Sequence, residues 1–242
     1  MNTRSISSIL GQLRSLGNPK NVAGMARYGI MSKNVLGIPT TELHTIAKEI
    51  GRDHTLARQL WKANILEARV LAIFIEEPKR VTERQMDRWA KDFDNWAICD
   101  GCCLHLFVHT PFAWKKAREW SKQKEEFVRR AAFALMAVLA VHDKGADDEA
   151  FLTLLPLIKK ASVDERNGVK KAVNWALRQI GKRNVSLNAK AVALAREIKK
   201  TDSPSARWIA SDALRELTSA AVFQRLAKKK VRSAPRASAS LR

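Results

Sequence analysis

The stretch FVRRAAFALMAVLAVH, residues 127–142, decides the fold class. It starts with two arginines and continues in almost entirely apolar residues, which is typical of a helix enclosed by other helices. Residues 65–77 are apolar along one wide helical face and are followed by Pro78, which cannot continue a helix. Residues 169–183, 187–200 and 205–218 repeat the amphipathic pattern and are separated by turn or cap residues. Alternating Val, Ile and Thr runs typical of strands are absent, so the sequence predicts an all-α protein.

Faint internal repetition predicts how the helices stack. Arg69, Arg130, Lys171 and Arg207 each begin an amphipathic segment, and the last three lie 41 and 36 residues apart. Periods near 40 residues are typical of HEAT-like helix pairs, which stack into a curved α-solenoid. The cations would then fall on one side of successive helices and form a basic concave groove. The alternative is that any all-α chain gives such matches by chance.

The charge balance favours a polyanionic partner. The 242 residues include 44 Lys and Arg against 24 Asp and Glu, a formal net charge of +20, and such an excess indicates nucleic acid. Residues 227–242 carry six of these cations and no acid, which predicts a flexible basic tail that binds phosphates irrespective of sequence. Residues 1–226, expected to form a single HEAT-like domain, keep the remaining +14.

The sequence predicts a soluble, cytoplasmic and nucleoid-associated monomer, without a membrane segment, a metal or a cofactor. No apolar run approaches the ~18 residues of a membrane span, and the first residues lack the apolar stretch of a secretory signal. Cys99, Cys102 and Cys103 indicate a reducing compartment. With His105 and His109 they point in different directions from one predicted helix, which favours buried thiols at a helix contact over zinc. Phosphate-binding glycine loops, HExxH and GxSxG are also absent.

The string DFDNWAICD, residues 92–100, is the first candidate for chemistry. Asp94 is predicted to cap a helix, on which Trp96 and Asp100, four residues apart, share a face. Asp is a poor helix former, yet Asp100 falls mid-helix among apolar residues. A carboxylate held beside an aromatic ring keeps a charge that water does not quench, so Asp100 is the candidate catalytic group. The alternative is a buried Asp that pairs with a neighbouring Arg for structural reasons.

A second helix offers residues suited to a nucleic-acid strand. Lys171 and Trp175 are four residues apart and share a face of the predicted helix, and Arg130 occupies the equivalent place one repeat earlier. A cation and an aromatic ring on one face suit phosphate together with sugar or base. The alternative for a single Trp on an amphipathic helix is a place in the core.

The chain resembles the DNA alkylation repair family of HEAT-like DNA glycosylases, the AlkD type. The resemblance covers roughly residues 20–217 and rests on the order of several short pieces. It implies that Asp100 is the catalytic carboxylate, that Trp96 and Trp175 hold the lesion-bearing deoxyribose, and that Arg130 and Tyr28 contact DNA. Ala97 stands where the family often has an acid, which leaves the carboxylate in place but affects its finer positioning. The matching pieces are MARY (25–28), LGIP (36–39), NW (95–96) running to Asp100, RRAA (129–132) and KAVNWALR (171–178).

The resemblance implies hydrolysis of N-glycosyl bonds to N3- or N7-alkylated purines in duplex DNA. Such bases are cationic and leave readily, so the expected role of ionised Asp100 is to stabilise positive charge on the sugar and to orient water. Two other functions stay open: a non-catalytic HEAT-like nucleic-acid-binding protein, and a protein scaffold, against which the basic body counts. Convergence of Trp96, Asp100, Arg130 and Trp175 on one concave surface would separate the first from the enzyme.

Overall fold

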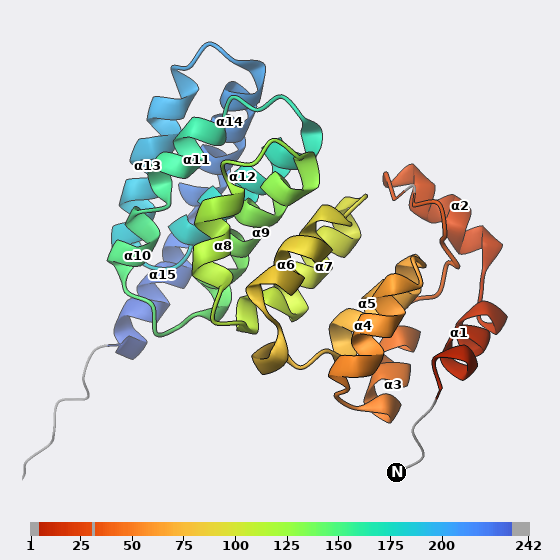
Figure 1. Ribbon diagram of the computed structural model, residues 1–242. Coiled ribbons are helices and arrows are strands. Elements are labelled where there is room, and N and C mark those ends of the chain that lie inside the picture. Colours follow the sequence, from red (N-terminus) through yellow and green to blue (C-terminus); the bar gives the residue numbers. More distant parts are fainter. Residues whose placement is uncertain (1–4, 31, 234–242) are drawn as a thin grey trace, which may run out of the picture. The chain divides into compact units, whose positions relative to one another are not determined.

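The computed structural model describes residues 5–30 and 32–233, and within them all regular structure is helical (Figure 1). The predicted all-α fold is confirmed. None of the helices in these residues has both the length and the apolar character needed to cross a membrane. The helices expected from the amphipathic segments are present as α5 (Leu66–Ile75), α9 (Glu126–His142), α12 (Asn167–Gly181), α13 (Val185–Lys199) and α14 (Pro204–Leu217).

The chain forms two compact units, residues 1–135 and 136–242. The boundary falls within α9. That residues 1–226 form a single HEAT-like domain stays a prediction. At the other end, α15 (Ala220–Ser233) continues past residue 227, so the expected start of the basic tail lies inside a helix. Residues 234–242 of that tail lie outside the described residues.

One layer of the first unit is formed by α4 (His54–Lys62), α6 (Glu83–Lys91) and α8 (Ala113–Trp120), which lie side by side. The indoles of Trp61 on α4 and Trp89 on α6 stack with centroids 3.9 Å apart and planes 2° apart. The ammonium of Lys116 on α8 lies 2.9 Å from the Asp87 carboxylate on α6. Aromatic stacking and an ion pair made by a buried lysine therefore hold this layer together.

The second layer contains α3 (Thr40–Ile50), α5, α7 (Trp96–His105) and α9, in which α5 packs against both α3 and α7. The buried thiols of Cys99 and Cys103 on α7 donate to the carbonyls of Phe127 and Ala131 on α9, at 3.5 and 3.6 Å. The cysteines thus lie at a helix–helix contact, as the sequence predicted. The remaining elements of this unit are α1 (Ile6–Ser15), α2 (Pro19–Arg27) and the short turns η1 (Pro78–Arg80) and η2 (Phe107–His109).

The second unit is built around α12, α13 and α14, which pack against one another, with α10 (Asp148–Leu152) and α11 (Leu155–Ala161) alongside. Between α12 and α14, Arg178 and Lys182 both lie 2.6 Å from the carboxylate of Glu216. The buried amide of Asn188 donates to the carbonyls of Gly181 and Leu217 and thereby ties α13 to the ends of its neighbours.

We expect Gly181→Ala to destabilise the protein by about 1–3 kcal/mol, the usual cost of overpacking. A Cβ at Gly181 would lie 2.8 Å from both Cδ atoms of the fully buried Leu217 and 3.0 Å from Cβ of Ala191. Gly11→Ala is the matched control, since a Cβ there has nothing within 4 Å and helical Ala is favoured over Gly. Urea unfolding of both variants checks this, and equal midpoints would contradict it.

Candidate functional site

The start of α7 sets the position of the candidate catalytic helix. Asn95, not the predicted Asp94, is its N-cap, because the Asn95 side chain accepts hydrogen bonds from the amides of Ala97 and Ile98. Asp94 instead accepts a hydrogen bond from the hydroxyl of Ser32. This hydroxyl in turn accepts one from the side-chain amide of Asn95. The prediction for Asp94 was wrong, since either side chain suits the cap position and tertiary contacts with Ser32 decide between them.

Trp96 is the first residue of α7 and projects from the protein surface. Trp96 is 40% exposed, and its indole N–H donates to the backbone carbonyl of Tyr28 at 2.8 Å. Tyr28, directly after α2, is 76% exposed. The structure therefore brings these two predicted DNA-contacting residues together and fixes the indole orientation through a backbone contact.

An apolar cavity of about 770 Å³ adjoins Trp96 and is lined by residues of α2, α3, α5 and α7. One wall contains Gly37, with φ of 77°, where a Cβ would collide with the Asn18 carbonyl, so only glycine fits this turn. The buried carboxylate of Glu67 accepts from the amides of Leu36 and Gly37, at 2.9 and 2.7 Å. Gly37, Ile38 and Pro39 of the LGIP segment thus line the cavity, and Glu67 on α5 holds the segment in place.

Asp100 and Arg130 form a bidentate ion pair between α7 and α9. Nε of Arg130 lies 2.8 Å from Oδ1 of Asp100, and Nη2 lies 2.6 Å from Oδ2. The Arg130 side chain is 7% exposed and that of Asp100 is 21% exposed. Burial raises the pKa of Asp100 above its ordinary value, although the hydrogen bonds and charge of Arg130 act in the opposite direction.

This pairing gives Arg130 a structural contact that the sequence left open as an alternative. The guanidinium is buried and faces Asp100, and the contact with the DNA backbone that the resemblance implied stays a prediction. Two parallel N–H···O bonds fix the plane of the carboxylate and favour its ionised form. Each carboxylate oxygen still has lone-pair capacity, and Asp100 is the partner that reaches solvent. The geometry therefore makes Arg130 a residue that positions Asp100.

The other two predicted residues, Lys171 and Trp175, lie on α12 in the second unit. Lys171 is exposed and Trp175 is half-buried, so both present part of their side chains to solvent. The described residues place Tyr28, Trp96 and Asp100 with Arg130 in the first unit. Their convergence with Trp175 stays a prediction.

A family model described as DNA alkylation repair enzyme matches residues 9–217. The chain belongs to this family. A solved structure described as "A new family of proteins related to the HEAT-like repeat DNA glycosylases with affinity for branched DNA structures" has a TM-score of 0.73 to this protein and is 21% identical, covering 88% of this chain and 95% of that chain. This likeness confirms the HEAT-like fold. A search of the curated proteins found no match.

In this member of the DNA alkylation repair family the Asp100 carboxylate is partly exposed, and it lies one helical turn from Trp96, which is also exposed. Such an arrangement can hold a sugar against the ring and a negative oxygen near it. No group of three or more His, Cys, Asp or Glu side chains within the described part of the chain could hold a metal ion.

Two features of the first unit were not predicted from the sequence: the cavity beside Trp96, and four cations that α4 and α6 direct to one pocket. Val70 and Phe74 line the cavity from α5. Both belong to the apolar helical face predicted for residues 65–77, and no local signal distinguishes a cavity wall from a core contact. Arg58 with Lys62 and Arg84 with Arg88 are cation pairs four residues apart, and that spacing could have been found in the sequence.

Proposed function

We propose that this DNA alkylation repair enzyme is a DNA N-glycosylase that excises cationic N3- and N7-alkylated purines from duplex DNA. The observation that carries the proposal is the carboxylate of Asp100, held in a fixed plane by Arg130 yet partly open to solvent beside the exposed Trp96. Family membership and a net charge of +20 agree with a DNA substrate.

In the proposed reaction the bond between C1′ of deoxyribose and the purine nitrogen breaks, and its electron pair neutralises the cationic base. Positive charge develops on the sugar, where the oriented Asp100 oxygens stabilise it. Water then adds to C1′ and loses a proton, which leaves an abasic site and the free base. The face of Trp96 is electron-rich and favours a cationic sugar beside it.

The Asp100–Arg130 pair limits which substrates this site can serve. A carboxylate neutralised by an adjacent guanidinium stabilises a cation less than an isolated carboxylate does, because the two charges oppose each other. The reaction therefore depends on a base that leaves without help. We expect release of positively charged 7-methylguanine and 3-methyladenine, and none of the neutral lesions uracil or hypoxanthine.

The test is incubation of the protein with duplexes that each contain one lesion: 7-methylguanine, uracil or hypoxanthine. Chromatography of the released base and alkaline cleavage at abasic sites measure the product, with spontaneous depurination subtracted. Release of 7-methylguanine alone supports the proposal. If the methylated duplex yields no free base and no abasic site, the proposal is contradicted. We further propose that the protein acts as a monomer on chromosomal DNA in the cytoplasm, which sedimentation and cell fractionation check.

A second candidate function is non-catalytic binding to DNA, including branched DNA. It is favoured by the ion pair itself, since Asp100 already has a structural partner, and by the affinity for branched structures named for the similar solved protein. Tight binding of the methylated duplex without any base release would support this second function.

A further inference from the structure

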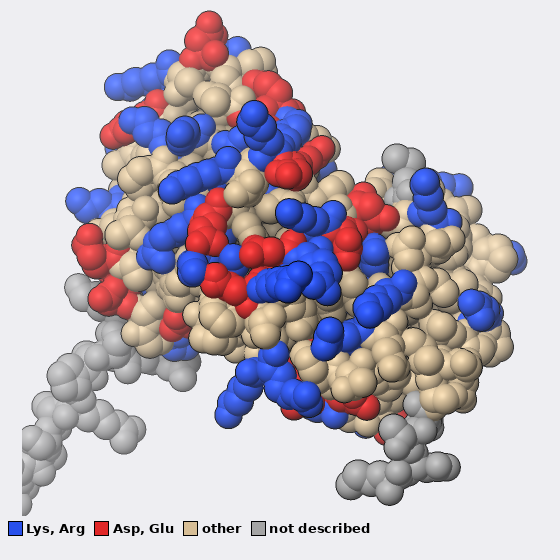
Figure 2. All heavy atoms as spheres, viewed as in Figure 1, with Lys and Arg blue, Asp and Glu red and all other residues tan. Residues whose placement is uncertain are grey.

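A basic pocket of about 470 Å³ lies on the α4–α6 layer of the first unit. Arg58 and Lys62 on α4 and Arg84 and Arg88 on α6 line it, and in each pair the two residues are four apart. Each helix therefore directs two cations to one side. Figure 2 shows Lys and Arg side chains gathered over these two helices.

The floor of the pocket is rigid and closed. It consists of the stacked indoles of Trp61 and Trp89, each 3% exposed, so a nucleic-acid base cannot insert between them. The Trp61 N–H donates to Asp92 at 2.8 Å, and the guanidinium of Arg69 lies over the Trp61 ring and donates to the Asp92 carbonyl. Asp92 and Arg69 thus line the pocket with their polar groups already engaged, and the exposed basic groups that a ligand meets are the cations at the rim.

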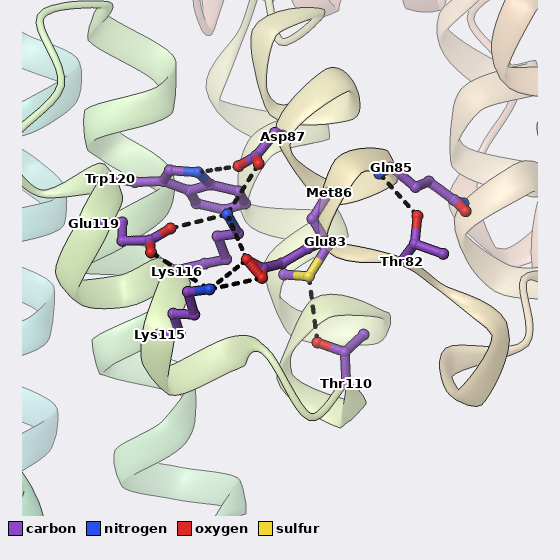
Figure 3. Close-up of polar contacts among 10 residues, drawn as sticks. All are labelled: Thr82, Glu83, Gln85, Met86, Asp87, Thr110, Lys115, Lys116, Glu119 and Trp120. Carbon is purple, nitrogen blue, oxygen red and sulfur yellow. Dashed lines mark hydrogen bonds and ion pairs between the residues drawn. The ribbon is translucent and has the colours of Figure 1, made fainter.

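The acids of α6 face away from this pocket and are neutralised by α8 (Figure 3). Lys115 lies 2.6 Å from the carboxylate of Glu83, and Lys116 lies 2.9 Å from that of Asp87. The N–H of Trp120 also donates to Asp87 at 2.8 Å. No carboxylate of α6 is thus available to the cations on its other side.

The four rim cations are exposed, and among the described residues none of them forms an ion pair. Like charges four residues apart destabilise a helix, and Arg84 lies in the first turn of α6, where the helix dipole disfavours a cation. Two such unpaired sets facing one pocket indicate an anionic ligand that supplies the missing charges.

We propose that this pocket binds the phosphodiester backbone of a second DNA segment, separate from the segment at Trp96 and Asp100. Each of the two cation pairs can contact successive phosphates of one strand. The floor of the pocket is closed, so the protein cannot recognise individual bases there. The pocket belongs to the layer of α4, α6 and α8, whereas Asp100 and Arg130 come from α7 and α9. The proposal therefore assigns the pocket and the Asp100 site to different arms of one branched DNA molecule. This inference goes beyond glycosylase activity and does not depend on it.

The test compares Arg58→Gln/Lys62→Gln and Arg84→Gln/Arg88→Gln with wild type on two probes, a linear duplex and a four-way DNA junction. The matched control is Arg196→Gln/Lys200→Gln, which removes two exposed cations with the same spacing from the last turn of α13 and its C-cap. Glutamine is a good helix former, so each variant keeps its helix.

We expect each pocket variant to bind the junction roughly tenfold more weakly, with a salt-dependence slope smaller by about 1.8, as for two lost phosphate contacts. Linear-duplex binding and 7-methylguanine excision should change by less than about twofold, within the scatter of single surface contacts. Junction affinity equal to that of the control variant would overturn the proposal. An equal loss on both probes would also overturn it, because the pocket would then serve the same segment as Asp100.

Discussion

Asp100→Asn should lower the single-turnover rate of 7-methylguanine excision by about 10²–10³, the usual effect of losing one preorganised electrostatic group. The amide preserves the size of the side chain and one acceptor oxygen for Arg130, but it removes the negative charge that faces the sugar. Binding to the methylated duplex, measured by fluorescence anisotropy, should stay close to wild type because only charge stabilisation at the transition state is lost.

Asp94→Asn is the matched control for this substitution. Asp94 is an exposed acid six residues before Asp100, and its contact with the Ser32 hydroxyl can be kept by an amide. This variant should excise at the wild-type rate. Wild-type excision by Asp100→Asn, or an equal loss in both variants, would remove Asp100 from the reaction.

The same assay gives a pH dependence with a defined sign. Burial raises the pKa of Asp100, so the ionised form that the reaction requires is lost as the pH falls through this raised value. Excision, corrected for spontaneous depurination, should therefore decline at a higher pH than expected for a solvent-exposed aspartate, about 3.9. The residual excision activity of Asp100→Asn should not show this decline at low pH.

Arg130→Gln should destabilise the protein by about 3–5 kcal/mol, because it leaves the buried side of Asp100 without its counter-charge. Burial raises the pKa of Asp100 and Arg130 lowers it, so the loss of Arg130 should raise this pKa further. The decline of excision at low pH should then begin at a higher pH. Urea unfolding measures the first effect and the pH profile measures the second. A purely structural arginine would alter stability without moving the pH profile.

A double-mutant cycle with Asp100→Asn/Arg130→Gln provides the control. Two neutral amides can hydrogen-bond to each other, so the double variant should be more stable than Arg130→Gln alone. Strictly additive losses would show that the two side chains do not interact in solution.

Local sequence patterns predicted several of the helices of this protein. The spacing of Trp96 and Asp100 correctly placed both on one helix, and the apolar run at residues 127–142 correctly predicted α9. The bidentate contact between Asp100 and Arg130 joins residues thirty apart, so helical periodicity leaves it undetermined. The sequence left a structural arginine partner as an alternative, and the structure supplies that partner without removing the carboxylate from the surface.

The stacked tryptophans and the paired acids of α6 had no local signal. Trp61 and Trp89 are each ordinary apolar positions on amphipathic helices, and only the packing of α4 against α6 brings the rings together. In the same way, Glu83 and Asp87 become unavailable to Arg84 and Arg88 only because α8 contributes two lysines. The uncompensated charge of that surface is therefore a tertiary property.

The three thiols of α7 have a consequence for a member of the DNA alkylation repair family. Cys99, Cys102 and Cys103 are fully enclosed, and burial raises the pKa of each. Thiolate is the form that attacks electrophiles, so these sulfur atoms are both hidden and held in their unreactive protonated state. The methylating agents that create damaged purines would thus leave the helix that carries Asp100 chemically intact.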